Sequence, residues 1–444
     1  GLAAPLPVYY LRLGRRSGTV VASALFALAF AFHNGKWYFT TFAGNKVMAA
    51  LACLTFALVY FAVLEAAAGI GRRRPALAPL ALPALWVGVD LLRTAIPGVR
   101  EAWFPLYANT QTGNVALLQV ASWGGVHAVT FVALGIAAAA AYWLRRPLRP
   151  LRVAWAALFL AAYAAIWWGG AGALEPPAEE RGSILTIACL QNGVVAEAAR
   201  HDFLADYEEM TAAALPRAGS GRPAVAVWPE TFFTSYDDQV SREAVGALAR
   251  RLDVHIVYHC YEKAAGGFYN VAALVDGRGR EVLKWRKRHP APGETSLKPG
   301  EEEPYRLYEA PWGATGLLVC YDDYFPAEAR RLAAAGARVI LIPSNDHGYG
   351  DGYFYRVHLN QALFRAVENR CAVAVAGYDG YSAVIDDAGR LRAFKGDHGR
   401  GFVAAEVEAG RGEAFYTRHP HLFPCLVAIM ALIVVAGVGG RRRE

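Results

Sequence analysis

Long apolar runs fill much of residues 1–171 and return near the end of the chain. An α-helix needs about 20 predominantly apolar residues to cross the hydrocarbon core of a bilayer. Six runs approach or reach this length, and we predict a membrane crossing in each, near residues 18–33, 46–69, 76–96, 124–144, 152–171 and 421–440. The pattern therefore predicts an all-α transmembrane helix bundle from residues 1–171, completed by a last helix and a basic tail in residues 421–444.

The third run contains three residues that are unusual in a membrane helix, Pro83, Asp90 and Arg93. Residues three apart lie on one face of a helix, so Asp90 and Arg93 can pair. Two interpretations are open: an ion pair inside the helix bundle, or an ion pair at the end of the helix at the membrane interface.

Residues 172–420 have a different pattern. From Ser183 onward, short β-branched and apolar runs alternate with helical ones, which is typical of a layered α/β domain. We predict strands at Ile184–Leu190, Ala224–Trp228, Val254–Tyr261, Tyr269–Val275, Thr315–Cys320, Val339–Ile342, Ala372–Ala376 and Ser382–Ile385. We predict helices at His201–Leu215, Ser241–Leu252, Pro326–Ala335 and Tyr355–Asn369. Turn signals at residues 276–279 and 386–389 indicate hairpins within the sheets.

The arginines predict how the helices are oriented. The chain is 55% hydrophobic and has a formal charge of +7, but its basic residues lie in short runs beside apolar stretches, so no nucleic acid partner is expected. Cytoplasmic loops are enriched in Lys and Arg. With six crossings, all four groups fall on one side: Arg12/Arg15/Arg16, Arg72/Arg73/Arg74, Arg145/Arg146/Arg149/Arg152 and Arg441/Arg442/Arg443. This predicts cytoplasmic termini and an extracytoplasmic domain of residues 172–420.

Two polar residues stand where predicted strands end. Glu230 follows the run Ala-Val-Ala-Val-Trp-Pro, and Cys320 ends the run Thr-Gly-Leu-Leu-Val before a helix that Pro326 is suited to start. A partly exposed thiol near a helix N-terminus favours the thiolate, which makes Cys320 a candidate nucleophile. The alternatives are a solvated loop carboxylate at Glu230 and a buried structural cysteine at Cys320. By composition alone, Lys287 belongs to a surface charge run with Lys284, Arg286 and Arg288.

No metal or cofactor is predicted. The six cysteines form no C-x-x-C pair, and His289, His347, His358 and His398 have no metal-ligand spacing. We interpret Arg365 and Glu368, three apart on a helix, as a structural ion pair and Asp346 as a loop brace.

Four segments occur in the order and spacing of the nitrilase (carbon–nitrogen hydrolase) superfamily: Val227-Trp228-Pro229-Glu230, Lys287–Glu294, Val319-Cys320-Tyr321-Asp322 and Ser344-Asn345-Asp346. Residues 364–370 and 382–390 resemble the apolipoprotein N-acyltransferases, the bacterial membrane branch, and residues 85–93 and 119–124 resemble that family's helical region. The resemblance covers about residues 80–440. It implies an α/β fold, a nitrilase-type αββα sandwich domain joined to an all-α transmembrane helix bundle.

The same resemblance implies a catalytic triad. Glu230 would be the general base, Cys320 the nucleophile, and Lys287 the cation that holds the thiolate and stabilises the tetrahedral intermediate. Supporting or substrate-binding roles would fall to Trp228, Glu294, Tyr321 and Asp322. Cys320 is expected to remain free of disulfides.

The chain departs from the family in several places. The family usually has Glu where this chain has Asp322, usually has eight crossings, and has different loops at residues 347–350 and 377–380. The six crossings found here predict that one N-terminal pair is missing. The departures leave the triad residues intact.

The implied reaction moves a fatty acyl chain from a phospholipid to Cys320 as a thioester, then to the α-amine of the diacylglyceryl-cysteine of a bacterial lipoprotein. The partners would be the phospholipid, the diacylated lipoprotein and the lipid bilayer. The implied location is the bacterial cytoplasmic (inner) membrane, with the catalytic domain on the periplasmic face. Two alternatives stay open: a membrane-tethered nitrilase-type amidohydrolase, and a non-enzymatic membrane scaffold, against which the intact triad argues.

Overall fold

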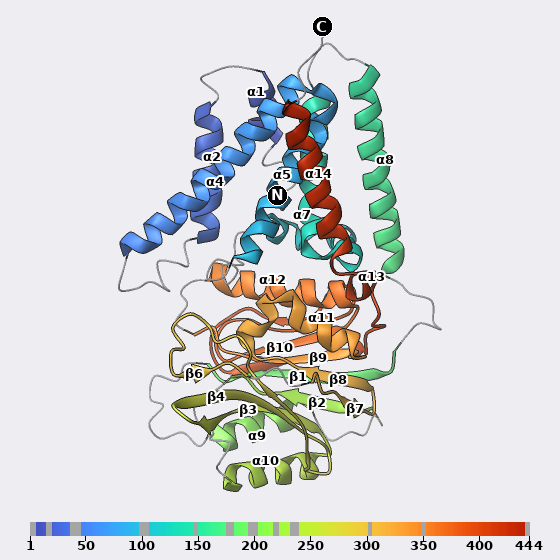
Figure 1. Cartoon of the computed structure of the whole chain (residues 1–444). Helices are drawn as coiled ribbons and strands as arrows, with labels where there is room; N and C mark the ends of the chain where they lie inside the picture. The colour runs from blue at the N-terminus through green and yellow to red at the C-terminus, as the bar shows by residue number, and fades with distance from the viewer. Residues whose placement is uncertain are drawn as a thin grey trace. The chain divides into compact units, whose positions relative to one another are not determined.

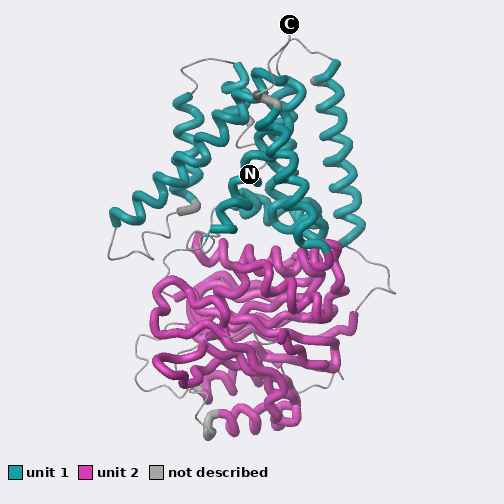
Figure 2. Tube along the Cα trace, in the orientation of Figure 1, with its two compact units in different colours: residues 1–175, 419–444 teal, residues 176–418 magenta. Residues whose placement is uncertain are grey.

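The computed structural model describes residues 6–14, 20–35, 46–96, 106–144, 150–174, 182–193, 203–215, 222–230, 239–300, 304–347 and 352–439. The chain divides into two compact units (Figure 2). The helical unit contains residues 1–175 and 419–444, and the α/β unit contains residues 176–418.

The helical unit packs long apolar helices against one another (Figure 1). Its helices are α1 (Leu6–Leu13), α2 (Val20–Gly35), α4 (Lys46–Arg73), α5 (Ala78–Ala95), α6 (Val115–Leu118), α7 (Ala121–Trp143), α8 (Pro150–Ala173) and α14 (Leu422–Gly439), with 3₁₀ turns at Pro75–Leu77 and Tyr107–Gln111. Helix α5 packs against α4, α7 and α14. The indole of Trp86 on α5 is fully buried and stacks on Tyr60 of α4 with ring centroids 4.4 Å apart.

Four helical segments are long and apolar enough to cross a membrane: Lys46–Arg73, Pro75–Ala95, Ala121–Trp143 and Val153–Ala173. They correspond to four of the six predicted crossings, and the chain is a multi-pass membrane protein. The first and last predicted crossings correspond to shorter apolar helices at Val20–His33 and Leu422–Ala436, so the count of six stays a prediction. Of the arginine groups, residues 15, 16, 145, 146, 149 and 441–443 lie outside the described residues.

The Asp90–Arg93 pair lies inside the helical unit. Asp90 is fully buried, Arg93 is 6% exposed, and Arg93 Nη2 lies 3.7 Å from Asp90 Oδ1. The Tyr60 hydroxyl donates a hydrogen bond to the same oxygen at 2.9 Å. A carboxylate in an apolar bundle needs such partners, and the structure favours the pair within the bundle over the pair at the interface.

The α/β unit contains two sheets. The first has the order β13-β1-β2-β3-β4-β5, with β6 paired to β4, and the second has the order β12-β11-β10-β9-β8-β7. The strands are β1 (Ile184–Gln191), β2 (Ala224–Val227), β3 (His255–Ala264), β4 (Gly267–Val275), β5 (Glu281–Arg286), β6 (Leu297–Lys298), β7 (Tyr308–Ala310), β8 (Gly313–Leu317), β9 (Val339–Ser344), β10 (Ala372–Gly377), β11 (Ser382–Ile385), β12 (Leu391–Lys395) and β13 (Gly401–Glu408). Strands β1, β2 and β3 are parallel, as are β8, β9 and β10.

Helices cover the outer face of each sheet (Figure 1). They are α9 (Phe203–Ala214), α10 (Gln239–Leu252), α11 (Pro326–Ala334) and α12 (Gly352–Asn369), followed by the short α13 (Phe415–Arg418). Met210 of α9 and Leu248 of α10 are buried in one cluster with Ala226 and Ile256 of the first sheet. Helices α11 and α12 lie over the second sheet. The order of layers, helices–sheet–sheet–helices, confirms the predicted αββα sandwich.

All eight predicted strands and all four predicted helices of this unit are present. The strand Ser382–Ile385 has the predicted bounds, and the others have shifted ends. The strand predicted to reach Cys320 ends at Leu317, and Cys320 begins a 3₁₀ turn, Cys320–Tyr324. The pattern missed five strands. Strands β6 and β7 have only two and three residues. The side chains of β5, β12 and β13 alternate between buried or half-buried and exposed positions, so their apolar runs are short.

Candidate active site

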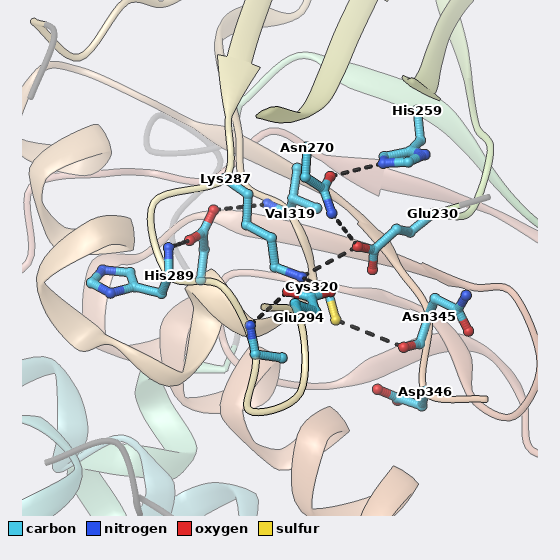
Figure 3. Close-up of polar contacts among 12 residues, drawn as sticks. Glu230, His259, Asn270, Lys287, His289, Glu294, Val319, Cys320, Asn345 and Asp346 are labelled. Carbon is cyan, nitrogen blue, oxygen red and sulfur yellow. Dashed lines mark hydrogen bonds and ion pairs between the residues drawn. The ribbon is translucent and has the colours of Figure 1, made fainter. Parts of the chain in front are cut away.

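Lys287 occupies the centre of a buried cluster of charges at the end of β5 (Figure 3). Its side chain is 1% exposed, and its Nζ lies 3.2 Å from Glu230 Oε1 and 3.0 Å from Glu294 Oε1. The backbone N–H of Lys287 donates to the Asn270 carbonyl at 2.7 Å, which aims the side chain into the site. The prediction from composition, a surface charge run, is wrong for this residue, whereas Lys284 and Arg286 do form a partly exposed cluster with Glu262.

Glu230 lies three residues beyond β2, and its own N–H donates to the Ser344 carbonyl at 3.3 Å. Its carboxylate is 3% exposed, so it is not a solvated loop residue. The oxygen Oε1 accepts hydrogen bonds from Lys287 Nζ and, at 2.5 Å, from Asn270 Nδ2. The oxygen Oε2 is buried without a conventional hydrogen bond in the described part of the chain, and the Cys320 thiol lies near enough to lower the pKa of the carboxyl.

The two carboxyl groups beside Lys287 have opposite pKa shifts. Burial alone would raise the pKa of Glu230, but the charges of Lys287 and His259 and the hydrogen bond from Asn270 outweigh it and lower the pKa. Burial and the charge of Glu230 raise the pKa of Glu294 despite Lys287. Pairs of carboxyl groups whose pKa values are pushed apart mark distinct acid and base roles. The arrangement makes Glu230 the ionised base and Glu294 the carboxyl that more readily holds a proton.

Cys320 has an unusual backbone and a buried thiol. Its φ is 45°, in the left-handed region that non-glycine residues rarely adopt. The side chain is 5% exposed, forms no disulfide, and points its Sγ toward the Asn345 carbonyl at 3.9 Å. Burial and the negative charge of Glu230 raise the pKa of the thiol well above its ordinary value, although Lys287 opposes them. The expectation of a partly exposed thiol that favours the thiolate is therefore wrong: the resting group is a neutral thiol facing a base.

Asp322 joins the cysteine turn to the lysine strand. Its Oδ1 accepts hydrogen bonds from the backbone N–H groups of Arg288 and His289 at 3.0 and 2.9 Å. Its Oδ2 accepts from Trp285 Nε1 at 2.9 Å and from the Val319 N–H at 3.2 Å. With four N–H donors on a fully buried carboxyl, Asp322 holds Lys287 and Cys320 at a constant separation.

The other predicted supporting residues differ in their distance from the reaction centre. Glu294 contacts Lys287 directly, and its Oε2 accepts a hydrogen bond from the Ala291 N–H at 2.6 Å. The Tyr321 ring packs beside Tyr324 and Phe325. The Trp228 indole stacks on Tyr207 of α9 and donates to Thr211, which places it in the core of the sandwich.

Sequence reasoning missed Asn270 and His259. Asn270 Oδ1 lies 2.8 Å from His259 Nε2, and this contact orients the amide so that Nδ2 faces Glu230. Both residues are nearly or fully buried. The available signal was one amide inside the apolar strand Tyr269–Val275, because a buried polar side chain needs a partner.

A second polar cluster lies beside Cys320. The potential ligand atoms of Cys320, Asp346 and His358 lie within 4.8 Å of one another, a composition that can hold a metal ion. Here both ring nitrogens of His358 face carboxylate oxygens, at 2.7 Å for Asp346 and 3.2 Å for Asp323. A metal ion would have to displace these contacts, so the group fits a hydrogen-bonded network better than a metal site. The absence of a metal stays a prediction.

The Arg365–Glu368 ion pair, at 2.8 Å, is fully buried.

Comparisons with known proteins agree with the two units. The carbon-nitrogen hydrolase family model matches residues 186–416, and the model of the apolipoprotein N-acyltransferase N-terminal domain matches residues 2–139. An apolipoprotein N-acyltransferase of Geobacter metallireducens is 26% identical over 88% of this chain and 80% of its own length. An apolipoprotein N-acyltransferase of Gloeobacter violaceus is 26% identical over 81% of this chain and 72% of its own length. A hydrolase in the pqqF 5′ region of Pseudomonas protegens is 33% identical over 41% of this chain and 68% of its own length.

Among solved structures, Nit3 of Saccharomyces cerevisiae, a member of branch 10 of the nitrilase superfamily, is 20% identical with a TM-score of 0.44, covering 56% of this chain and 97% of that chain.

The raised pKa of the Cys320 thiol predicts the pH dependence of its alkylation. Only the thiolate reacts, so the rate of iodoacetamide labelling should still be rising at about pH 9, roughly in proportion to hydroxide. Mass spectrometry of the Cys320 peptide measures the rate, and Cys320→Ala identifies labelling at other cysteines. A rate that is already constant near about pH 7 would contradict a thiol held neutral by burial and Glu230.

Replacing Lys287 by methionine removes the charge while keeping a long side chain. The largest influence that opposes burial would then be gone, leaving only His259 and the hydrogen bonds of Asn270 and Cys320, so the pKa of Glu230 should rise and less of the base should be ionised. We expect acylation of Cys320, measured in a single turnover per folded molecule, to slow by about 10²-fold or more. Lys284→Met, which changes a partly exposed lysine of β5, is the control and should stay within about twofold. Near-normal acylation in folded Lys287→Met protein would refute the assigned role.

Proposed function

This chain belongs to the carbon–nitrogen hydrolase family, in its apolipoprotein N-acyltransferase branch, and we propose that it is a lipoprotein acyltransferase. It transfers a fatty acyl chain from a phospholipid to the α-amine of the diacylglyceryl-cysteine of bacterial lipoproteins. The acyl chain is carried on Cys320 as a thioester. The observation that carries the proposal is a buried Glu230–Lys287–Cys320 cluster in a chain that also has membrane-spanning helices. An amidase acting on a soluble substrate has no need of those helices, whereas both substrates of the proposed reaction are anchored in lipid.

The first half-reaction forms the thioester. Glu230 takes the proton of the Cys320 thiol as sulfur attacks the ester carbonyl of the phospholipid. Its buried oxygen Oε2 suits this role, because Oε1 already accepts hydrogen bonds from Lys287 and Asn270. The ammonium of Lys287 stabilises the oxyanion of the tetrahedral intermediate. The C–O bond then breaks, Glu230 returns the proton to the leaving alkoxide, and a lysophospholipid departs.

In the second half-reaction Glu230 is again the base, and the Cys320 sulfur becomes the leaving group. The neutral α-amine of the acceptor attacks the thioester carbonyl, and Glu230 accepts a proton from the amine nitrogen. When the C–S bond breaks, the proton returns to sulfur and the Cys320 thiol is regenerated with an amide as product. Glu294 also lies beside Lys287, and its pKa is raised. It can therefore hold a proton while Glu230 stays ionised.

The proposed location is the bacterial cytoplasmic membrane, with residues 172–420 on the periplasmic face and both termini in the cytoplasm. The distribution of the four arginine groups supports this orientation. The same distribution supports the proposal that residues 1–171 and 421–444 form the membrane domain.

The proposal predicts where the acyl chain goes. Protein in phospholipid-containing micelles, given a synthetic diacylated lipopeptide with a free N-terminus, should convert the peptide to a form heavier by one acyl group, detected by mass spectrometry. Cys320→Ala should give no product, because the thioester cannot form. Release of free fatty acid while the peptide remains unchanged would contradict the transferase and favour the amidohydrolase alternative.

A further inference from the structure

His358 of α12 is buried beside the nucleophile but has no part in the steps above. It is 2% exposed. Its Nδ1 lies 2.7 Å from Asp346 Oδ1, and its Nε2 lies 3.2 Å from Asp323 Oδ1 and 3.4 Å from the Cys320 carbonyl oxygen. The ring of Tyr324 packs against it with centroids 4.9 Å apart. The imidazole thus joins helix α12 to the 3₁₀ turn that carries Cys320 and to the segment that follows β9.

Each ring nitrogen of His358 faces acceptor oxygens, an arrangement that favours a ring with hydrogen on both nitrogens. A neutral imidazole has one donor and one acceptor nitrogen, and an acceptor facing a carboxylate oxygen would be repelled. Burial alone lowers the pKa of His358, but the charges of Asp346 and Asp323 outweigh burial and raise the pKa well above its ordinary value. A doubly protonated ring can therefore bind the two segments at once.

The turn that His358 contacts is conformationally strained. Cys320 has a φ of 45°, a backbone conformation that non-glycine residues keep only where the surrounding structure holds it. His358 meets the turn at two points, the Cys320 carbonyl and the Asp323 carboxylate. At its other nitrogen it holds Asp346, the neighbour of Asn345, whose carbonyl faces the thiol.

We propose that His358 is a positioning residue, which clamps the Cys320 turn to the segment after β9 and so keeps the thiol aimed at Glu230. The proposal rests on the proposed function, since it assumes that Cys320 is the nucleophile. His358 acts through Cys320, so its loss should slow the chemical step without changing how phospholipid binds. Misplacement of a nucleophile by about 1 Å can cost about 10²-fold in rate.

The test compares His358→Gln with His398→Gln. His398 also pairs with an aspartate, Asp379, at 3.1 Å, but its side chain is exposed. In the full-length protein in micelles, His358→Gln should slow formation of the Cys320 acyl adduct by about 10- to 100-fold per folded molecule, with KM for phospholipid within about twofold of wild type. His398→Gln should match the wild type in both. A purely structural role would lower the unfolding temperature and leave the rate per folded molecule unchanged, which would overturn the proposal.

Two further measurements keep the result decisive. If His358→Gln does not fold, Asp323→Asn removes the charge that faces Nε2 with little change of shape, and a wild-type acylation rate in that variant would overturn the clamp. Labelling of Cys320 by iodoacetamide follows the position of the thiol without any acyl donor. The two failures can be told apart. If the wild-type protein forms no thioester, the proposed function is refuted. If iodoacetamide labels Cys320 at the same rate in His358→Gln and in the wild type, the clamp is refuted.

Discussion

The positive charge of Lys287, buried between Glu230 and Glu294, is the interaction on which the site depends. A lysine that is 1% exposed is stable only with partners, and a carboxylate that is 3% exposed stays ionised only beside a cation. Each of the two charged groups therefore stabilises the charge of the other. The ion pair keeps Glu230 charged, and burial together with the negative charge of Glu230 raises the pKa of the Cys320 thiol. The result is a resting state in which base and nucleophile face each other before any substrate arrives.

The sandwich supplies this arrangement from both of its sheets. Glu230 follows β2 and Lys287 follows β5 in the first sheet, whereas Cys320 and Asn345 follow β8 and β9 in the second. Catalytic groups at strand ends are held by the ladder hydrogen bonds behind them. Asp322 adds three N–H contacts, from Trp285, Arg288 and His289, that tie the segment after β8 to the first sheet at the site. The left-handed backbone of Cys320 is held in place by surroundings that include the four N–H contacts of Asp322.

Much of this could be predicted from sequence. Apolar strands and amphipathic helices have strong periodic signals, so the αββα sandwich and the long membrane helices were predictable, and motif spacing identified Glu230, Lys287 and Cys320. Burial of individual groups was not predictable. Lys287 lies among charged neighbours and is nevertheless buried, and the thiol of Cys320 looked exposed because its strand seemed to reach the sheet edge. Asn270 and His259 escaped notice, and His358 was considered only as a metal ligand, because their partners meet them only in the folded chain.

The central claim, that a neutral Cys320 thiol is activated by Glu230 beside Lys287 to accept an acyl chain, is tested most directly by intact mass spectrometry. Wild-type protein, Cys320→Ala and Glu230→Gln would each be incubated with one phospholipid species and no acceptor. The account predicts one added acyl mass on the wild type, removed by hydroxylamine as a thioester should be, with no adduct on Cys320→Ala and a strongly slowed adduct on Glu230→Gln. An adduct that persists on Cys320→Ala, or that forms at the wild-type rate on Glu230→Gln, would contradict it.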